Sequence, residues 1–406
     1  MNRKIYFFSL AIVLTSFFCF SSQVYSYPKF AAYTGSKCQS CHINPTGAGI
    51  RNQWGVLYSK ENLFMKPFEK ANKTTDIDPQ VSKGIRIGGD MRAAYFDDQQ
   101  GDQPNFNTFF AMQADLYVNA QMNKYIGVTI APGIYIPDTY SSNPLPLKYE
   151  VYGLVSNLPA NLYFKVGRFI PNFGTRIPEH RAYNRLYNNL YTPLAADAGI
   201  EAGIAPGPFT LTAGLSNGSS PTVTGQVNNS FDFDTQKQLT VSADYRWRNS
   251  DKDTKYTFGL GGSFITNPFK YDPANNINAL RQIAAGFFSI GLFQRVAILG
   301  EISYNRLNIR DSVSTRSDFS TLFGEVDFRV VKGMELKFQY ENYNPSLGIK
   351  NDPSKRQRYS FGLMFYPLTG LEVESIFRLV KAGKGDGPVP FTVKNNEFQT
   401  IFKFYF

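Results

Sequence analysis

Cysteine and histidine are scarce in this chain of 406 residues, and three of them stand together near its start. The sequence has three cysteines and two histidines, and Cys38, Cys41 and His42 form the pattern C-x-x-C-H. Two thiols at this spacing can form thioethers with the two vinyl groups of a haem, and the adjacent imidazole then lies under the iron as its proximal ligand. The pattern therefore predicts one covalently attached haem c on Cys38 and Cys41, with His42 bound to the iron.

Other uses of two neighbouring thiols fit this sequence less well. A structural zinc site needs four cysteine or histidine ligands, and the chain after residue 26 offers two of each, widely spaced. A redox pair of the thioredoxin kind needs a strand–helix–strand context, which the residues around Cys38 do not suggest. A plain disulfide between Cys38 and Cys41 remains the alternative to haem attachment.

The residues before the motif predict that the chain is exported. Residues 1–26 have the order of a signal peptide: a basic start at Arg3 and Lys4, an apolar stretch, and residues small enough for cleavage at Val24 and Ser26. We therefore expect the mature chain to begin at Tyr27, outside the cytoplasm, where c-type haem is attached. The longest nearly apolar run after that point, 283–293, is 11 residues, whereas a spanning helix needs about 20.

The composition excludes several classes of protein. Aromatic residues make up 16% of the chain and charged residues 18%, which is too aromatic and too weakly charged for a disordered protein. Three cysteines cannot supply a disulfide scaffold for this length. The formal net charge is +10, but no nucleic-acid-binding module is visible, so we expect no nucleic-acid partner.

From about residue 84 onward the chain repeats strand-length segments in which apolar and polar residues alternate. The connections between them are alternately short and long, and the last strand ends on Phe406, as is typical of outer-membrane barrels with short periplasmic turns. The predicted fold class is all-β, a transmembrane antiparallel barrel of about 16 strands over 84–406. We expect strands at 84–96, 106–122, 125–135, 147–157, 160–169, 196–206, 208–217, 236–248, 255–265, 280–291, 294–305, 318–330, 334–344, 356–367, 370–381 and 394–406.

The predicted mono-haem segment, 27–83, is too short for a large core of its own. We expect it to pack into the barrel mouth, on the periplasmic side or inside the lumen. Arg51 is a candidate partner for a haem propionate, and a solvated side chain is the alternative.

Two residues are candidates for the second axial ligand of the iron. His180 lies in the longest predicted loop, 170–195, and the two prolines and two arginines of 171–181 favour a structured loop that folds inward. Arg176 and Arg181 would then meet the haem propionates. A surface position for His180 is the alternative. Met65 could instead fold back within the small segment, and ligation by histidine in place of methionine would lower the haem potential.

The order of these parts resembles the fused cytochrome–porin family of bacterial outer membranes, which includes outer-membrane Fe(II) oxidases. The matching residues are Phe30-Ala31, Thr34-Gly35 and Cys38…Cys41-His42, similar to the family pattern F-A-R-x-T-G-x-x-C-x-x-C-H. Ala32 stands where the family usually has arginine, and residues 44–52 depart from its usual continuation. The resemblance implies electron transfer across the outer membrane.

Two functions of different classes follow from these patterns. The first is an electron conduit or metal oxidoreductase that links a soluble periplasmic carrier to an extracellular donor or acceptor, with iron as one candidate. Carboxylates on the polar strand faces, such as Glu335, Glu341 and Glu374, could guide Fe(II) or simply solvate a lumen. The second is a diffusion porin whose haem segment is a sensor or a structural plug. Both predict contact with outer-membrane lipid.

Overall fold

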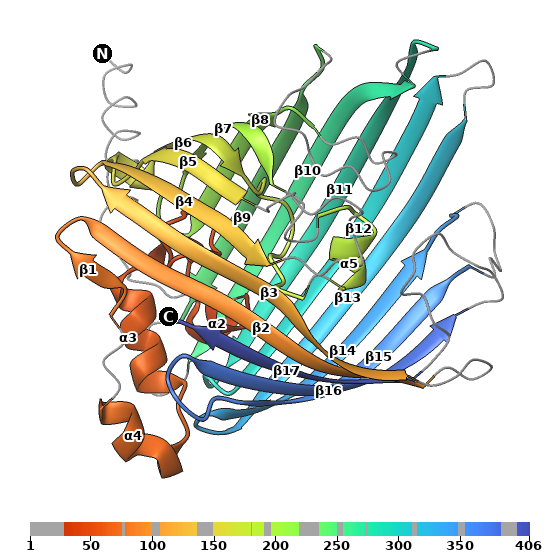
Figure 1. Ribbon diagram of the computed structural model, residues 1–406. Helices are drawn as coiled ribbons and strands as arrows, with labels where there is room; N and C mark the ends of the chain where they lie inside the picture. Colours follow the sequence, from red (N-terminus) through yellow and green to blue (C-terminus); the bar gives the residue numbers. More distant parts are fainter. Residues whose placement is uncertain are drawn as a thin grey trace, which may run out of the picture.

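The chain forms one closed barrel of antiparallel strands in a computed structural model (Figure 1). The structure describes residues 28–74, 78–99, 106–135, 149–179, 181–190, 196–218, 235–249, 255–272, 275–310, 315–347, 354–382 and 396–406. The predicted signal peptide, residues 1–26, lies outside the described residues. In the described part, sixteen strands, β2 to β17, pair in chain order, and β17 closes on β2.

The strands lie where the alternation predicted them, with ends that differ by a few residues, except that β10 runs seven residues further than expected. A short additional strand, β1 (Gln80–Ser82), pairs with β2. The predicted all-β barrel of about sixteen strands is therefore confirmed. The barrel strands are β2 (Ile85–Gln99), β3 (Phe106–Gln121), β4 (Ile126–Tyr135), β5 (Tyr149–Val155), β6 (Tyr163–Phe169), β7 (Asp197–Ile204), β8 (Phe209–Ser216), β9 (Gln238–Arg248), β10 (Tyr256–Asp272), β11 (Ile277–Leu292), β12 (Val296–Arg310), β13 (Arg316–Val331), β14 (Met334–Asn344), β15 (Arg356–Phe365), β16 (Leu371–Ala382) and β17 (Asn396–Tyr405).

The two faces of each strand have opposite environments. On β14, Glu335, Lys337 and Glu341 are buried inside the barrel, whereas Phe338 is 45% exposed on the outer surface. Successive strand residues point to opposite faces, so a period-two sequence places its polar residues inward and its apolar residues outward. This is the reverse of a soluble sandwich and is typical of membrane barrels. In the part of the chain that is described, no helix is long and apolar enough to cross a bilayer.

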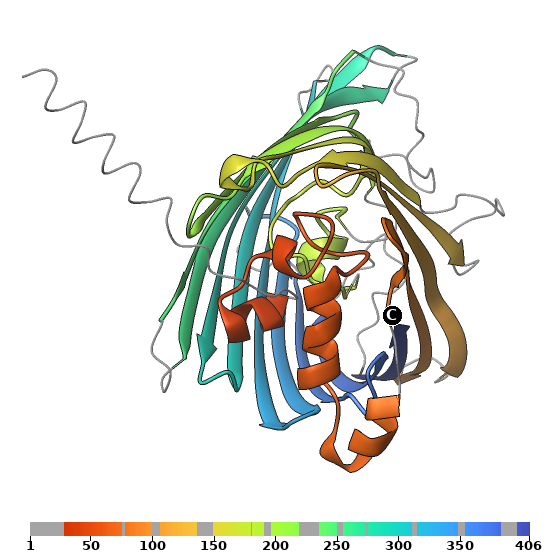
Figure 2. The same cartoon turned by 90° about the vertical axis from the view of Figure 1, so that its left-hand side faces the viewer.

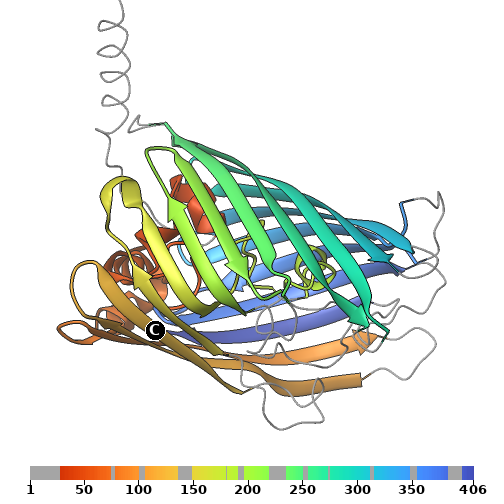
Figure 3. The same cartoon turned by 90° about the horizontal axis from the view of Figure 1, so that it is seen from above.

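The amino-terminal segment contributes helices at the end of the barrel where the short turns and the C-terminus lie (Figures 1 and 3). These elements are α2 (Pro28–Thr34), η1 (Cys38–Ser40), α3 (Gln53–Asn62), η2 (Lys66–Phe68) and α4 (Glu69–Thr74). Helix α2 packs against β10, β11 and β12. Figure 2 shows the segment within the mouth of the barrel, and Figure 1 shows α3 and α4 at this end, beyond the strands. We call this end the short-turn end.

The long connection between β6 and β7 folds into the barrel. Phe173 and Ile177 are buried, and the short helix α5 (Tyr183–Leu186) contacts β12, β13 and β14. The expectation of a structured inward loop is therefore confirmed for the described residues 170–179 and 181–190. This segment is referred to below as the inward segment.

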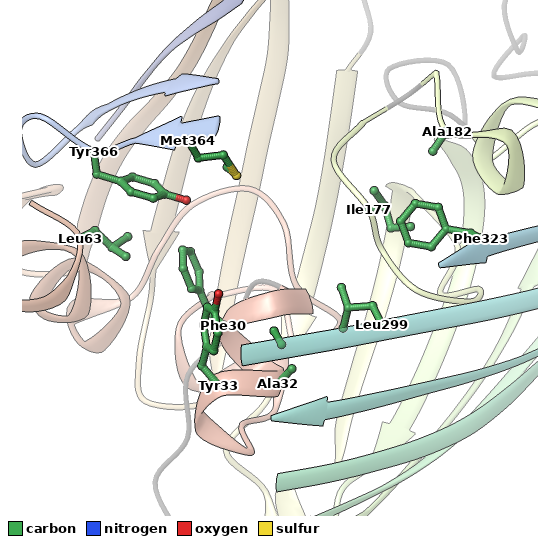
Figure 4. Close-up of a cluster of buried hydrophobic side chains, with 11 residues drawn as sticks. Phe30, Ala32, Tyr33, Leu63, Ile177, Ala182, Leu299, Phe323, Met364 and Tyr366 are labelled. Carbon is green, nitrogen blue, oxygen red and sulfur yellow. The ribbon is translucent and has the colours of Figure 1, made fainter. Parts of the chain in front are cut away.

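An apolar cluster joins the amino-terminal segment to the inward segment inside the barrel (Figure 4). Phe30 and Tyr33 of α2 belong to it, together with Ile177 of the inward segment and Tyr366 beyond β15. Three parts of the chain that are far apart in sequence thus share one core, which fixes the helices relative to the wall.

Candidate functional site

The Cys–His motif forms a compact turn that is closed by its own backbone. The amides of Cys41 and His42 both donate to the carbonyl oxygen of Cys38, at 3.2 and 3.1 Å. The side-chain amide of Asn52 donates to the carbonyl oxygens of Gln39 and Ser40, at 3.2 and 2.9 Å. The Oδ1 atom of Asn52 caps α3 by accepting the Gly55 amide at 3.1 Å. One asparagine therefore ties the motif to the start of α3, as N-cap residues do.

Two glycines allow the chain to close around the motif. A Cβ atom on Gly55 would overlap the carbonyl oxygen of Cys41, so glycine lets α3 lie directly against the turn. Gly47 has φ +87°, and a Cβ there would lie 3.2 Å from the Sγ atom of Cys38. Both positions therefore favour glycine, because a side chain would push α3 or the loop 44–49 away from the thiols.

His42 is held by its backbone surroundings in a way that suits metal ligation. Its Nδ1 atom lies 3.3 Å from the carbonyl oxygen of Gly49. Because a carbonyl only accepts, Nδ1 carries the proton in this contact and Nε2 is the ring nitrogen with the lone pair. Such a backbone bond fixes the ring tautomer of ligating histidines.

Cys38 and His42 line the same cavity, which lies in the lumen and has a volume of about 210 Å³. Its lining includes Gly47 and Gly49 of the loop after the motif, and Ile170 and Arg176 of the inward segment. Cationic side chains outnumber acidic ones in the cavity lining: Lys37, Arg51, Arg92, Arg176, Arg185, Arg246 and Lys403 against Asp90, Glu150 and Asp244. A bound group with negative charges therefore fits its electrostatics.

The arginines that were predicted to meet the haem propionates differ in whether they line the cavity. Arg176 lines the cavity, donates to the carbonyl oxygen of Gly47 at 2.7 Å and has a buried Nε atom without a hydrogen-bond partner. Arg51 also lines it and lies over the ring of Tyr405 at 4.4 Å. Arg181 instead makes two 2.9 Å hydrogen bonds to Glu397 on the barrel wall. Arg176 and Arg51 remain candidates, and the described cavity lining does not include Arg181.

The two predicted candidates for the second iron ligand have different outcomes. Met65 lies on the rim at the short-turn end, where its amide donates to Tyr366 at 2.9 Å and its side chain packs on Gly333. It is not part of the cavity lining that includes His42. His180 lies outside the described residues. Among the residues that the structure describes, the lining contains no methionine and no histidine besides His42.

Two buried lysines connect the amino-terminal segment to the barrel, a role that the sequence analysis did not predict. Lys29 of α2 is fully buried and lies 2.8 Å from Glu335 and 3.8 Å from Asp327. Lys165 of β6 lies 2.7 Å from Glu201 and donates to the Oδ1 atom of Asn44, next to the motif, at 3.2 Å. Period-two alternation identifies such lysines as lumen-facing, but it does not identify the partner.

Lys37, the residue before the motif, is also affected by its position inside the barrel, through its hydrogen bonds and its pKa. Its Nζ atom donates to the carbonyl oxygens of Ala205 and Phe209, at 3.1 and 2.7 Å. Burial lowers the pKa of Lys37 to about 8, and the nearby Asp244 carboxylate opposes this shift.

The donor set at the motif fits a covalently held haem better than a bare metal ion. Cys38 and Cys41 are not joined in a disulfide. Within the described residues, no group of three histidine, cysteine or acidic side chains is arranged to hold a metal ion. The imidazole with an oriented ring and the two thiols are the groups that covalent haem attachment requires, and Arg176, whose buried Nε has no hydrogen-bond partner, adds a cation beside them.

Comparison with known proteins shows the fold. No protein-family model and no curated protein sequence matches the chain. Among solved structures, the outer-membrane channel DcaP of Acinetobacter baumannii has a TM-score of 0.56 at 13% identity, over 81% of this chain and 100% of that chain. OmpF of Salmonella typhi, solved with daunomycin, has 0.56 at 12%, over 79% and 97%. The anion-selective porin from Comamonas acidovorans has 0.54 at 9%, over 79% and 99%.

Proposed function

We propose that this chain is an outer-membrane porin-like barrel that carries one haem c on Cys38 and Cys41 and passes electrons across the membrane. The short-turn end faces the periplasm, in keeping with the usual orientation of such barrels. A soluble periplasmic carrier and an extracellular donor or acceptor are the partners at the two ends. The observation that carries the proposal is that Cys38 and His42 line one cavity inside the barrel.

The residues around the cavity have separate tasks in this proposal. Cys38 and Cys41 hold the haem covalently, and the Nε2 atom of His42 binds its iron while Gly49 fixes the ring. Arg51 and Arg176 neutralise the propionates. When bound, the haem supplies a one-electron site within a membrane that otherwise blocks electrons.

The lumen carboxylates lend less support to iron as the external partner. Glu335 lies 2.8 Å from Lys29, Glu341 lies 2.6 Å from Arg358, and Glu374 lies 2.8 Å from Lys337. Because these cations neutralise them, the three carboxylates do not form a path for Fe(II). The proposal therefore rests on the haem motif and concerns electron passage, with iron as one partner to be tried.

The test begins with the mass and spectrum of the mature chain. We expect the added mass of one haem and a reduced-minus-oxidised haem c band, both of which are lost in Cys38→Ala/Cys41→Ala. Proteoliposomes with an external donor and an internal acceptor should then show electron flux in the wild type only. A chain without the added mass, or with equal flux in the double variant, contradicts the proposal.

A second function is favoured by the anchoring of the amino-terminal segment in the mouth. Lys29 holds this segment through a buried ion pair with Glu335, and Lys165 holds it through a buried hydrogen bond to Asn44, as expected for a structural plug in a diffusion porin. Swelling of liposomes in sugar solutions, together with no haem-dependent electron flux, would favour this second function.

A further inference from the structure

Helix α3 presents large apolar side chains to solvent at the short-turn end. Trp54 is 46% exposed and Leu57 is 38% exposed, one turn apart on the same face of the helix. The opposite face, with Gly55, Val56 and Ser59, is buried. Phe68 of η2 is also exposed. Exposed tryptophan beside other apolar side chains is typical of protein-binding surfaces.

This apolar face lies next to the Cys–His turn. Asn52, at the N-cap of α3, donates to Gln39 and Ser40 within the motif. Trp54 stands between this cap and Gly55, which packs against the carbonyl oxygen of Cys41. A protein that covered Trp54 would therefore lie one helical turn from the motif, outside the barrel and on its periplasmic side.

The charged residues around this face are mainly cationic. Lys66 and Lys70 are exposed in η2 and α4, and two exposed acids lie among them: Glu61, on the same face of α3 as Leu57, and Glu69. Nearby, the Nζ atom of Lys332 lies 3.5 Å from the centre of the Phe64 ring, on the turn against which the segment packs. By sequence, the short turns contain five cations and two acidic residues: Lys124, Lys252, Lys255, Arg295 and Lys332 against Asp251 and Asp253. The rim therefore attracts a partner with an acidic surface.

We propose that the Trp54–Leu57 face of α3, within this basic rim, is the docking site for a soluble periplasmic electron carrier with an acidic face. The inference rests on the proposed function, because it names the partner surface of the same electron path. Complexes between electron-transfer proteins are usually short-lived and have small contact areas, and charges at the rim speed their association. An apolar centre surrounded by charged side chains suits such a complex.

The experiment measures binding separately from haem chemistry. The full chain and its Cys38→Ala/Cys41→Ala variant are placed in zwitterionic nanodiscs with the periplasmic end accessible. The probes are the acidic soluble domain of cytochrome b5 and the basic mitochondrial cytochrome c. We expect the acidic probe to bind both chains at low ionic strength and to be released by salt. The basic probe should bind at least tenfold more weakly. Binding with no haem in the wild type would contradict the proposed function and leave the docking site intact.

Matched variants test the site itself. Trp54→Ala should weaken binding of the acidic probe about tenfold, as loss of a central tryptophan does. Trp247→Ala is the control, because Trp247 is 47% exposed on β9 of the barrel wall. Lys66→Gln/Lys70→Gln should slow association severalfold, whereas Lys237→Gln/Lys381→Gln, at the opposite end, should not. Equal effects of the two tryptophan variants would overturn the proposal. So would a lysine effect seen only on binding to anionic lipid vesicles, which would assign the rim to lipid.

Discussion

At the scale of single residues, Gly55 sets how closely α3 approaches the Cys–His turn. Gly55→Ala places a methyl group on the carbonyl oxygen of Cys41, and overpacking of this kind costs about 1–3 kcal/mol. We expect the α3 amides to exchange with deuterium about tenfold faster or more. Gly286→Ala is the control, since nothing lies within 4 Å of its added Cβ. Equal exchange in both variants would show that α3 does not depend on this contact.

Lys29 is the second residue on which the amino-terminal segment depends. Lys29→Met leaves the buried Glu335 and Asp327 without their shared cation, and removing one partner of a buried pair costs about 3–5 kcal/mol. We expect α2 to lose its exchange protection and 28–74 to become sensitive to protease in nanodiscs. Lys381→Met, at the exposed end of β16, should leave both unchanged. Adding Glu335→Gln to Lys29→Met should restore part of the protection, and a full loss in the double variant would contradict this role.

At the scale of elements, the inward segment lines part of the cavity and places its two arginines in different surroundings. Arg176 contacts Gly47 beside Cys38, whereas Arg181 pairs with Glu397. Both belong to the loop in which the sequence placed candidate propionate partners. Only the contacts made by the folded loop distinguish them.

This difference can be measured on the haem-loaded chain. Arg176→Gln removes a positive charge beside the cavity, which favours the oxidised iron, so the midpoint potential should fall. Arg181→Gln removes the same charge from a site outside the lining and should leave the potential nearly unchanged. Redox titration of both variants gives the comparison. Equal shifts would mean that the haem does not lie against Arg176.

At the scale of the whole molecule, the amino-terminal segment and the inward segment together narrow the lumen. Helix α2 contacts β10 to β12, the rim residue Met65 lies on the turns that follow β13 and β15, and Lys165 of β6 binds Asn44. The segment thus touches the wall on several sides. It does not contribute a strand to the sixteen-stranded barrel, apart from the short addition of β1.

Removal of residues 28–74 should therefore open the channel without unfolding the barrel. We expect a severalfold higher single-channel conductance in planar bilayers and faster swelling of liposomes in sugar solutions. Heat-modifiable migration in gels reports whether the barrel has formed. An unchanged conductance in a folded truncated barrel would show that the inward segment alone limits passage.

The sequence was enough to predict the strand count and the polarity of the two barrel faces. It also contains the C-x-x-C-H motif, from which haem attachment is predicted. The reason is that each depends on neighbours within a few residues: alternation has a period of two, and the motif spans five positions. The inward course of the described residues 170–179 and 181–190 was also predictable in kind, from the prolines and arginines of this loop.

The partners across the lumen were decided by the tertiary structure. Lys29 meets Glu335, Lys165 meets Glu201 and Asn44, and Arg176 but not Arg181 reaches the motif loop. Period-two alternation places all of the strand residues among these inside the barrel, but it cannot choose among the many polar side chains there. That choice depends on strand register, on closure of β17 against β2 and on how the helices sit in the mouth. These features bring together residues that lie far apart in the sequence.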